Sequence, residues 1–341
     1  MKNTLLARAR PLAVRSVGLG CMGMVSAYPP IPDKKDMIRF TREAVDQGAT
    51  FLDTAEVYGT QTDPHANETL VGQALAPVRD QVVLSTKFGL TFDFASGKTP
   101  LPIVPDSRPE TIRRSVEGSL RRLGTDHIDL YFQHRIDPAV APEEVAEGMA
   151  DLIREGKITH WGISEANEDY LRRAHKVCPV TAVQNRYSMM ARQYESLFPT
   201  LEELGIGFVA FSPMANGFLT GQYGKGAAFD PRYDYRSSMP QFTDQAVDQN
   251  QALLILLTTL AQEKGATPAQ ISLAWMLGKK PWIVPIPGTR KEARMAENAG
   301  AAQVALTPQE VAALDQALDA MSMSPVFGGT DLSAHAKEGD Q

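Results

Sequence analysis

Short apolar runs alternate with amphipathic segments along almost the whole chain. The apolar runs have the length of strands, and the segments between them carry apolar residues at helical spacing, as Met37, Phe40 and Ala44 do. Strands that alternate with helices are typical of βα units and a parallel sheet. The strand-like runs are residues 16–19, 50–53, 82–86, 128–132, 159–163, 182–184, 207–211 and 283–286. Eight such runs match the strand number of a closed (β/α)8 barrel, or TIM barrel, and we predict this α/β fold.

The predicted helices carry start and stop signals. Gly48, Gly124 and Gly156 each follow an amphipathic segment, at the place where a glycine ends a helix. Three residue pairs have the spacing of a capping box: Ser107 with Glu110, Thr267 with Gln270, and Thr307 with Glu310. These local signals predict the same order of elements as the periodicity.

The predicted elements form one continuous unit. No linker, repeat or shift in composition divides the chain, so we predict a single barrel domain over residues 1–341 rather than an open doubly wound sheet. The longest irregular stretch, residues 221–244, follows the seventh predicted strand, and a loop at that position lies on the active-site face of a barrel. Residues 247–264 form an additional helical stretch, and residues 322–341 are predicted to be an irregular tail.

Charge and hydropathy narrow the choice of partners. The chain has 34 basic and 40 acidic residues, a formal net charge of −6, and no long block of Lys or Arg. This gives no electrostatic case for nucleic acid or an anionic membrane. The longest apolar run, residues 252–260, is shorter than the roughly 20 residues that a bilayer requires. We therefore expect a small-molecule partner, and the oligomeric state stays open.

Cysteine and histidine usage indicates a reducing compartment and a site without metal. The chain has two cysteines and no CxxC pair, and its first residues lack the apolar core of a signal peptide. Its histidines show no metal-ligand spacing. We expect a cytoplasmic protein with no disulfide framework and no metal site.

A glycine-rich segment follows the first predicted strand. Gly18, Gly20 and Gly23 match the GxGxxG pattern, but a Rossmann dinucleotide site needs a helix that opens on the third glycine. Residues 24–32 follow instead, and their three prolines are incompatible with a first helical turn. We interpret the segment as a loop at the mouth of the first strand, where the backbone can approach a ligand closely.

Polar side chains stand at the ends of three successive predicted strands. Asp53 ends the second strand, Lys87 follows the third and His134 follows the fourth, while Tyr58 lies five residues after Asp53. Each has an ordinary explanation alone, as a cap, a solvated lysine or a loop histidine. Because the carboxyl ends of parallel barrel strands converge on one face, we expect all of them to share one site.

The chemistry of these residue types points to proton transfer by a phenol. A free phenol has a pKa of about 10, and a neighbouring ammonium favours its ionised form. Lys87 is the candidate for that ammonium, and Asp53 is the candidate that keeps it charged and oriented. His134 can hydrogen-bond the phenol or a substrate oxygen. Such a set suits protonation of a carbonyl oxygen while hydride arrives at its carbon.

At these residues the chain resembles the aldo-keto reductase family, in its long-chain bacterial and plant branch. The resembling segments are GLGCMGM at 18–24, DTAEVYG at 53–59, QHR at 133–135, WGISE at 161–165 and IPGTR at 286–290. The resemblance implies NAD(P)H-dependent carbonyl reduction. It also implies that Tyr58 is the general acid, that Lys87 and Asp53 tune it, and that His134 orients the carbonyl.

The resemblance also implies a cofactor site. Ser164 and Gln184 match residues that bind the nicotinamide carboxamide, and Phe211 matches an aromatic residue that stacks on the ring. The pyrophosphate loop would comprise Ser212, Pro213, Met214, Gly217 and Leu219; the adenosine end Gly288, Thr289, Arg290, Arg294, Glu297 and Asn298; and the glycine-rich loop would add Gly20, Cys21 and Met22. One departure is Glu165, since many relatives have Asn there.

Two arginines favour NADPH/NADP+ over NADH. The guanidinium groups of Arg290 and Arg294 suit a 2′-phosphate, although the same residues could form a solvated helix face. For the substrate, the expected pocket walls are Tyr28, Phe88, Phe132 and the 221–244 loop, which favour an aromatic or partly apolar aldehyde, with ketones and quinones as further classes. Arg236, in the same loop, is either a contact for an anionic substituent or a solvated arginine.

Two other functions remain open from the sequence. The resemblance includes potassium-channel β subunits, so a regulatory or sensor subunit that holds NADPH with little turnover is one alternative. A glycoside hydrolase on a barrel is the other, because Asp53, Glu56 and Glu165 could supply its pair of carboxylates.

Overall fold

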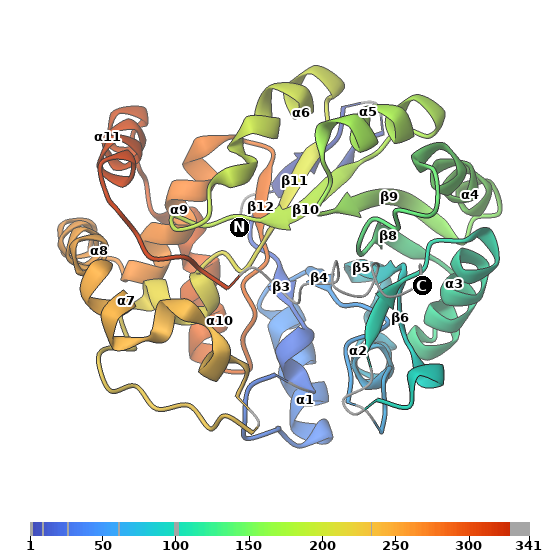
Figure 1. The fold of residues 1–341 in the computed structure, drawn as a ribbon, viewed down its shortest axis with the longest axis horizontal. Coiled ribbons are helices and arrows are strands. Elements are labelled where there is room, and N and C mark those ends of the chain that lie inside the picture. Colours follow the sequence, from blue (N-terminus) through green and yellow to red (C-terminus); the bar gives the residue numbers. More distant parts are fainter. Residues whose placement is uncertain are drawn as a thin grey trace.

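A parallel sheet of eight strands forms the wall of a barrel (Figure 1). The computed structural model describes residues 3–8, 10–25, 27–60, 62–98, 102–232 and 234–327. In sheet order the strands are β3 (Leu19–Gly20), β4 (Phe51–Asp53), β5 (Val83–Phe88), β8 (Ile128–Gln133), β9 (Ile158–Ser164), β10 (Ala182–Arg186), β11 (Gly207–Phe211) and β12 (Ile283–Pro285). The barrel closes between β12 and β3, where the Gly18 amide donates to the Pro285 carbonyl at 2.9 Å and Gly20 pairs with Gly288. The predicted (β/α)8 barrel is confirmed.

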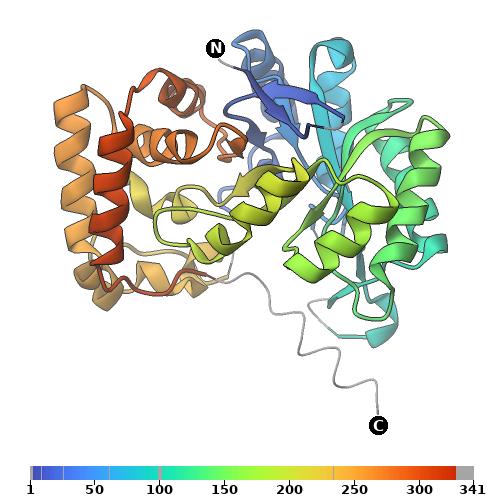
Figure 2. The ribbon, with the colours of Figure 1, turned by 90° about the horizontal axis from the view of Figure 1, so that it is seen from above.

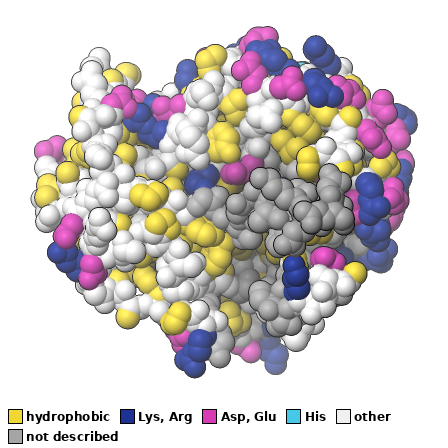
Figure 3. All heavy atoms as spheres, in the orientation of Figure 1, with side chains coloured by type: hydrophobic (Ala, Val, Ile, Leu, Met, Phe, Trp, Pro, Cys, Tyr) yellow, Lys and Arg dark blue, Asp and Glu magenta, His cyan; other side chains and the backbone are white. Residues whose placement is uncertain are grey.

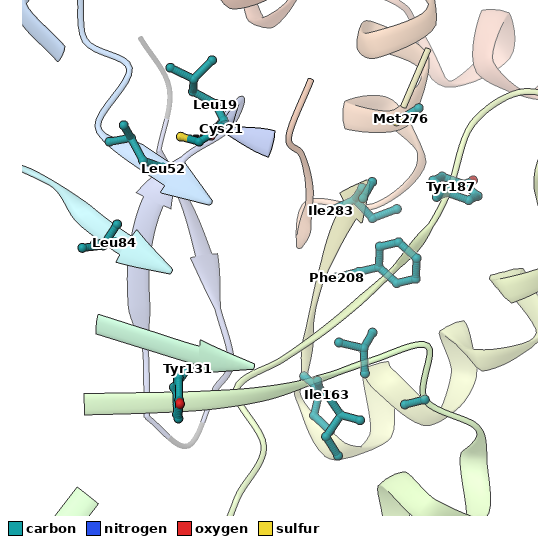
Figure 4. Close-up of a cluster of buried hydrophobic side chains, with 14 of the residues drawn as sticks. Leu19, Cys21, Leu52, Leu84, Tyr131, Ile163, Tyr187, Phe208, Met276 and Ile283 are labelled. Atoms are coloured by element: carbon teal, nitrogen blue, oxygen red, sulfur yellow. Dashed lines mark hydrogen bonds between the residues drawn. The ribbon is translucent and has the colours of Figure 1, made fainter. Parts of the chain in front are cut away.

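Side chains of the strands alternate between two apolar layers. Phe132 and Val209 belong to a cluster inside the barrel, whereas their chain neighbours Tyr131 and Phe208 pack outward against the helices. Figure 4 shows part of this outer layer, including Leu84. Both layers are apolar, which explains why the strands appear in the sequence as nearly continuous hydrophobic runs.

Helices surround the barrel, and the first six follow one another around it in chain order (Figures 1 and 2). The helices are α1 (Lys34–Asp46), α2 (Ala66–Leu75), α3 (Pro109–Leu123), α4 (Pro142–Arg154), α5 (Glu168–Val177), α6 (Phe198–Leu204), α7 (Asp244–Gln249), α8 (Gln251–Lys264), α9 (Pro268–Lys279), α10 (Glu292–Gly300) and α11 (Pro308–Asp319). The helices α7 and α8 account for the additional helical stretch that the sequence predicts.

Two of the three predicted capping boxes are present. Thr267 caps α9 and Thr307 caps α11, each with the reciprocal bond from its partner. The third prediction is wrong: the N-cap of α3 is Arg108, because Pro109 occupies the first helical position. Ser107 instead accepts a hydrogen bond from the Gln133 amide at 3.0 Å.

A hairpin that the sequence analysis missed closes the amino-terminal end of the barrel. It consists of β1 (Asn3–Leu6) and β2 (Leu12–Arg15), paired antiparallel. Leu6 and Val14 reach the interior cluster, and a Cβ atom on Gly207 would lie only 2.4 Å from the Leu6 side chain. Figure 2 shows the hairpin, in dark blue, across one end of the barrel. A second hairpin, β6 (Leu90–Phe92) with β7 (Ile103–Pro105), follows β5.

The loop after the seventh barrel strand is long, as predicted. It begins with the 3-10 segment η5 (Ala215–Thr220) and later contains η6 (Tyr235–Ser238) and η7 (Pro240–Phe242). Tyr223, Phe229 and Phe242 pack their rings together, which gives the loop a small core of its own. Residue 233 lies outside the described residues.

The described part of the predicted C-terminal tail has no helix or strand but is fastened to this loop region. The Asn250 amide donates to the Ser324 hydroxyl at 2.7 Å, and the Phe327 amide donates to Gln241 at 3.0 Å. Residues 328–341 of that prediction lie outside the described residues.

The surface carries charges of both signs. Figure 3 shows acidic and basic side chains interspersed along the right-hand rim, while hydrophobic side chains gather nearer the centre of this face. Ion pairs such as Arg173 with Glu143, between α5 and α4, are part of this pattern. Of the helices that the structure describes, none combines the length and the hydropathy needed to cross a bilayer.

Candidate active site

Lys87 is the centre of the candidate site. Its ammonium donates to Asp53 Oδ1 at 2.5 Å, to the Thr54 carbonyl at 2.7 Å and to the Tyr58 hydroxyl at 3.3 Å. Lys87 and Asp53 are 1% and 3% exposed, whereas Tyr58 is half-buried. The phenol is therefore the member of this group that faces the mouth of the barrel.

The Asp53 carboxylate is held from both sides. Its second oxygen accepts from the Ser85 hydroxyl and from the Gln184 amide, each at 2.8 Å. Burial acts to lower the pKa of Lys87, but the Asp53 charge and Tyr58 outweigh it and raise that pKa above its ordinary value. The lysine therefore stays protonated beside the phenol.

His134 completes the group as a neutral imidazole. Its backbone amide donates to the Phe88 carbonyl at 2.7 Å, and its ring meets the Tyr58 ring edge-on at a centroid distance of 5.7 Å. Burial, followed by the charges of Arg135 and Lys87, holds the pKa of His134 well below its ordinary value. No atom in the described part of the chain bonds its buried Nδ1.

The loop that carries Tyr58 is fastened at several points. The Asn67 amide at the start of α2 donates to the Tyr58 carbonyl at 3.0 Å, and the Glu56 amide donates to the Lys87 carbonyl at 3.3 Å. The Asn67 side chain in turn bonds Thr54 and the Cys21 carbonyl, at 2.7 and 2.8 Å. This loop therefore ties β4, β5 and the glycine-rich loop together.

A buried polar cluster behind the same loop was not anticipated. Glu56 accepts from the Ser115 hydroxyl at 3.1 Å and lies 3.8 Å from Arg122, whose Nε donates to the fully buried Glu68 at 2.6 Å. Burial, and then the charge of Glu68, raise the pKa of Glu56 to about 8. Thr86, next to Lys87, donates to Glu68 at 2.6 Å.

This cluster removes the basis for the glycoside hydrolase alternative. Glu56 is 5% exposed and faces α3, not the mouth, and Asp53 is already paired with Lys87. Neither carboxylate is placed to act in the acid and base pair that such chemistry requires.

The residues predicted for the nicotinamide lie together. Ser164 and Gln184 are paired in register on β9 and β10, and the Ser164 hydroxyl donates to the Gln184 carbonyl at 2.7 Å. Phe211 ends the next strand, with Arg186 over its ring. Glu165, the departure from many relatives, has a positive φ of 57°.

The predicted pyrophosphate loop has the backbone of a ligand-binding segment. Ser212, Ala215 and Asn216 all have positive φ values, of 50°, 48° and 58°, and Gly217 follows at 99°. Left-handed conformations of non-glycine residues are strained, and they cluster where a loop clamps a ligand. The Ala215 and Gly217 amides donate to the Ser212 and Met214 carbonyls, so the strained, internally bonded backbone of this loop is the feature that fits a ligand clamp.

The glycine-rich loop can contact a ligand through its backbone but not through the Cys21 thiol. Cys21 is fully buried, and burial, followed by the charge of Asp53, raises its pKa to about 12. A Cβ atom on Gly20 would lie 2.8 Å from the Ile286 carbonyl, so only glycine permits this approach of β3 to the segment that carries Gly288.

The predicted adenosine end also fits an anionic ligand. Arg290 donates to the Pro30 carbonyl at 2.9 Å, and Arg294 donates to the Gln222 side chain. No carboxylate in the described ranges pairs with either guanidinium. Thr289 and Asn298 line a small cavity of about 20 Å³.

Two of the predicted pocket residues do not reach the mouth. Lys87 faces the barrel interior, so the next residue, Phe88, faces outward, where its ring packs on Tyr131 at 4.9 Å. Phe132 is inside the barrel but fully buried in the interior cluster, and it has no exposed surface for a substrate. The expectation that these two rings line the pocket is therefore wrong.

The other two predicted pocket residues lie side by side. The Arg236 guanidinium lies 5.4 Å from the Tyr28 ring centroid, and it pairs with Asp234 at 2.6 Å. The Tyr28 hydroxyl accepts from the Asn216 amide at 3.2 Å, which connects this pair to the predicted pyrophosphate loop. In the described ranges, His, Cys, Asp and Glu side chains form no cluster that could hold a metal ion.

Comparison with known proteins agrees with this geometry. The aldo/keto reductase family matches residues 16–319. A Glycine max protein named "Probable aldo-keto reductase 1" is 38% identical over 319 residues, which cover 93% of this chain and 88% of that protein. The chain therefore belongs to the aldo/keto reductase family, a family of oxidoreductases that generally use nicotinamide cofactors.

Solved structures of the same family are similar over nearly the whole chain. Glycerol dehydrogenase AKR11B4 from Gluconobacter oxydans has a TM-score of 0.82 and 27% identity, with 96% of this chain and 98% of that chain covered. The holo form of aldo-keto reductase AKR11C1 from Bacillus halodurans has a TM-score of 0.74 and 26% identity, with 96% and 99% covered.

Proposed function

We propose that this protein reduces aldehydes, and by extension ketones or quinones, to alcohols with NADPH, and that Tyr58 is the general acid. The observation that carries the proposal is the position of the Lys87 ammonium, which bonds the Asp53 carboxylate and the Tyr58 hydroxyl at once. This arrangement links a buried, charged lysine to a phenol at the mouth of the barrel.

Each residue of the site has a separate role in the protonation of the carbonyl oxygen. A bound nicotinamide cofactor supplies hydride. The Tyr58 hydroxyl donates its proton to the oxygen, and Lys87 stabilises the phenolate that is left. Asp53 keeps the ammonium charged and aimed, since it holds Lys87 on one oxygen and is itself held by Ser85. His134, neutral and close to the Tyr58 ring, orients the carbonyl by a hydrogen bond without adding charge.

The choice of NADPH rests on the arginines of the adenosine end. Among the residues that the structure describes, Arg290 and Arg294 bond only neutral oxygens, which supports the availability of both guanidinium groups for a phosphate. A planar guanidinium matches phosphate oxygens with two parallel hydrogen bonds.

The test is the substitution Tyr58→Phe. We expect the rate of NADPH-dependent aldehyde reduction to fall by about 100-fold or more, because general acid catalysis contributes about 10²–10⁴-fold. NADPH binding, followed by its fluorescence, should persist. Tyr170→Phe is the matched control, because it also removes one tyrosine hydroxyl. Tyr170 lies on α5, and its hydroxyl bonds the Gln133 side chain at 3.0 Å.

Two results would count against the proposal. An active Tyr58→Phe enzyme would remove the role of that hydroxyl. Tight NADPH binding by the wild type, without turnover across aldehydes, ketones, quinones and sugars, would favour the sensor alternative.

A further inference from the structure

Arg186 lies at the mouth of the barrel, and no ion pair or hydrogen bond joins its guanidinium to another described residue. It ends β10 and is 7% exposed, and its guanidinium carbon lies 5.2 Å from the centroid of the Phe211 ring. Within the described ranges, no carboxylate, carbonyl or hydroxyl oxygen accepts a hydrogen bond from its guanidinium. Leaving a nearly buried cation unpaired is costly, and such cations are normally paired in folded proteins.

The immediate surroundings add a second positive charge. Arg135 donates to the Ser164 hydroxyl at 3.3 Å. The pKa of Arg186 is lowered, first by burial and further by the charge of Arg135, whereas the charge of Glu165 acts to raise it. The charge of Glu165 acts to raise the pKa of both Arg186 and Tyr194. Its Oε1 is buried without a hydrogen-bond partner in the described residues. The charges that act at this point are thus two guanidinium groups and one carboxylate, which leaves a surplus of one positive charge.

The position of Arg186 relates this charge to the candidate chemistry. Gln184 and Arg186 face the same side of β10, and the Gln184 amide bonds Asp53 at 2.8 Å. Two residues along a strand span about 6.6 Å. Arg186 therefore stands one step above the Lys87 and Asp53 pair, on the side from which a carbonyl compound would approach Tyr58.

We propose that Arg186, beside Arg135, binds the carboxylate of an oxo acid substrate, whose aldehyde or ketone group then lies at Tyr58 and His134. This inference rests on the proposed reductase function and specifies its substrate class. A carboxylate carries one negative charge, which matches the surplus, whereas a phosphate monoester carries about −1.5 to −2 at pH 7. A carboxylate also matches the guanidinium fork in geometry.

The experiment compares oxo acids with their own methyl esters. The probes are 4-formylbenzoate and 5-oxopentanoate, each beside its methyl ester, with NADPH as the reductant. We expect the wild type to show a kcat/KM at least about tenfold higher for the acids, because a hydrogen-bonded charge contributes more than a neutral contact. The ratio of acid to ester should fall close to one in Arg186→Gln, through KM, and should recover in part in Arg186→Lys.

Arg173→Gln is the matched control for net charge. It removes the same charge from an exposed ion pair with Glu143, between α5 and α4 in the outer layer of helices. The acid-to-ester ratio of this variant should equal that of the wild type.

Several outcomes overturn the inference. A wild type that reduces esters and acids equally well lacks the anion site, and the reductase function stands. An equal loss for acid and ester in Arg186→Gln, or weaker NADPH binding in the absence of substrate, assigns the guanidinium to the scaffold or the cofactor instead. If neither acid nor ester consumes NADPH, the proposed function itself fails.

Discussion

The charged residues around the mouth fall into two kinds according to what holds them. Lys87 is bound to Asp53, and Arg236 is bound to Asp234, so each of these cations is neutralised within the chain. Arg290 and Arg294 bond a backbone carbonyl and a side-chain amide oxygen. The first kind stabilises and orients groups of the protein. The second kind is not neutralised by its partners and can therefore bind an anionic ligand.

This difference leads to a prediction for Arg294. We expect Arg294→Ala to raise the Kd of NADPH by about 10- to 100-fold, because a hydrogen bond to a charged group contributes about 1.5–3 kcal/mol. The Kd of NADH, which lacks the 2′-phosphate, should change by less than about threefold. Fluorescence titration with both cofactors measures the effect, and equal losses for the two would remove the case for NADPH specificity.

At the scale of elements, the Tyr58 loop is attached to α2 and α3 through a cluster that titrates. Glu56 accepts a hydrogen bond from Ser115 of α3. Arg122 lies closer to Glu68 of α2, at 2.6 Å, than to Glu56, at 3.8 Å. One guanidinium thus serves two buried carboxyl groups. Glu56 therefore holds a proton at neutral pH, in accord with its raised pKa of about 8.

The sign of the resulting pH dependence follows from linkage. Glu56 keeps its proton up to about pH 8 in the native state, whereas an unperturbed carboxyl loses it near 4.5. The native state therefore binds more protons in this window, and the free energy of unfolding falls as pH rises through it. Glu56→Gln cannot titrate, so its stability relative to the wild type should increase between pH 5 and 8, by on the order of a few kcal/mol.

Urea unfolding at pH 5.5, 7 and 8.5 measures this difference. Glu147→Gln, at an exposed position of α4, is the control and should follow the wild-type pH dependence. If the curves of Glu56→Gln and the wild type stay parallel across this range, Glu56 is not the titrating group.

Long apolar runs made most barrel strands predictable from the sequence, whereas shorter elements were not. The hairpin β1–β2 has four-residue strands that mix polar and apolar positions, as in Asn3–Leu6, and so gives no periodic signal. Its place is decided by contacts with distant residues such as Gly207.

The candidate site shows the same limit at single residues. Asp53, Tyr58, Lys87 and His134 were found because polar residues at three successive strand ends form a pattern. Phe88 was misplaced because a shift of one residue along a strand reverses the direction of a side chain.

The sequence did not predict the roles of Arg186 and of the buried Glu56, because each role depends on the charges that lie beside the residue in the folded chain. A single arginine at the end of a strand, or a single glutamate in a loop, has no signature in sequence. Their roles arise from which charges fold up beside them, namely Arg135 and Glu165 in one case and Glu68 in the other.

At the scale of the whole molecule, the barrel is closed by few contacts. Between β12 and β3 the structure has the bond from Gly18 to Pro285, a bond from Gly20 to Pro287 at 3.3 Å, and the pairing of Gly20 with Gly288. Residues proposed for the cofactor flank this closure on both sides. A bound cofactor would therefore join the first and last strands of the barrel.

We expect NADPH to stabilise this closure. At about 100 times its Kd, a ligand that binds only the native state adds about 2.7 kcal/mol to the free energy of unfolding. Amide hydrogen exchange should slow more at residues 18–20, Ile286 and Gly288 than in α4 and α5, on the opposite side of the barrel. Stabilisation without slower exchange at the closure would place the cofactor elsewhere.

The hairpin at the amino-terminal end has a consequence for how the protein is made. It is synthesised well before the strand on which it packs, since Leu6 lies against Gly207 and the Arg8 amide donates to the Gly205 carbonyl at 2.9 Å. Contacts between such distant parts of a chain form late, because the intervening loop must close first. The apolar side chains of this hairpin therefore stay uncovered during synthesis until the seventh barrel strand has emerged.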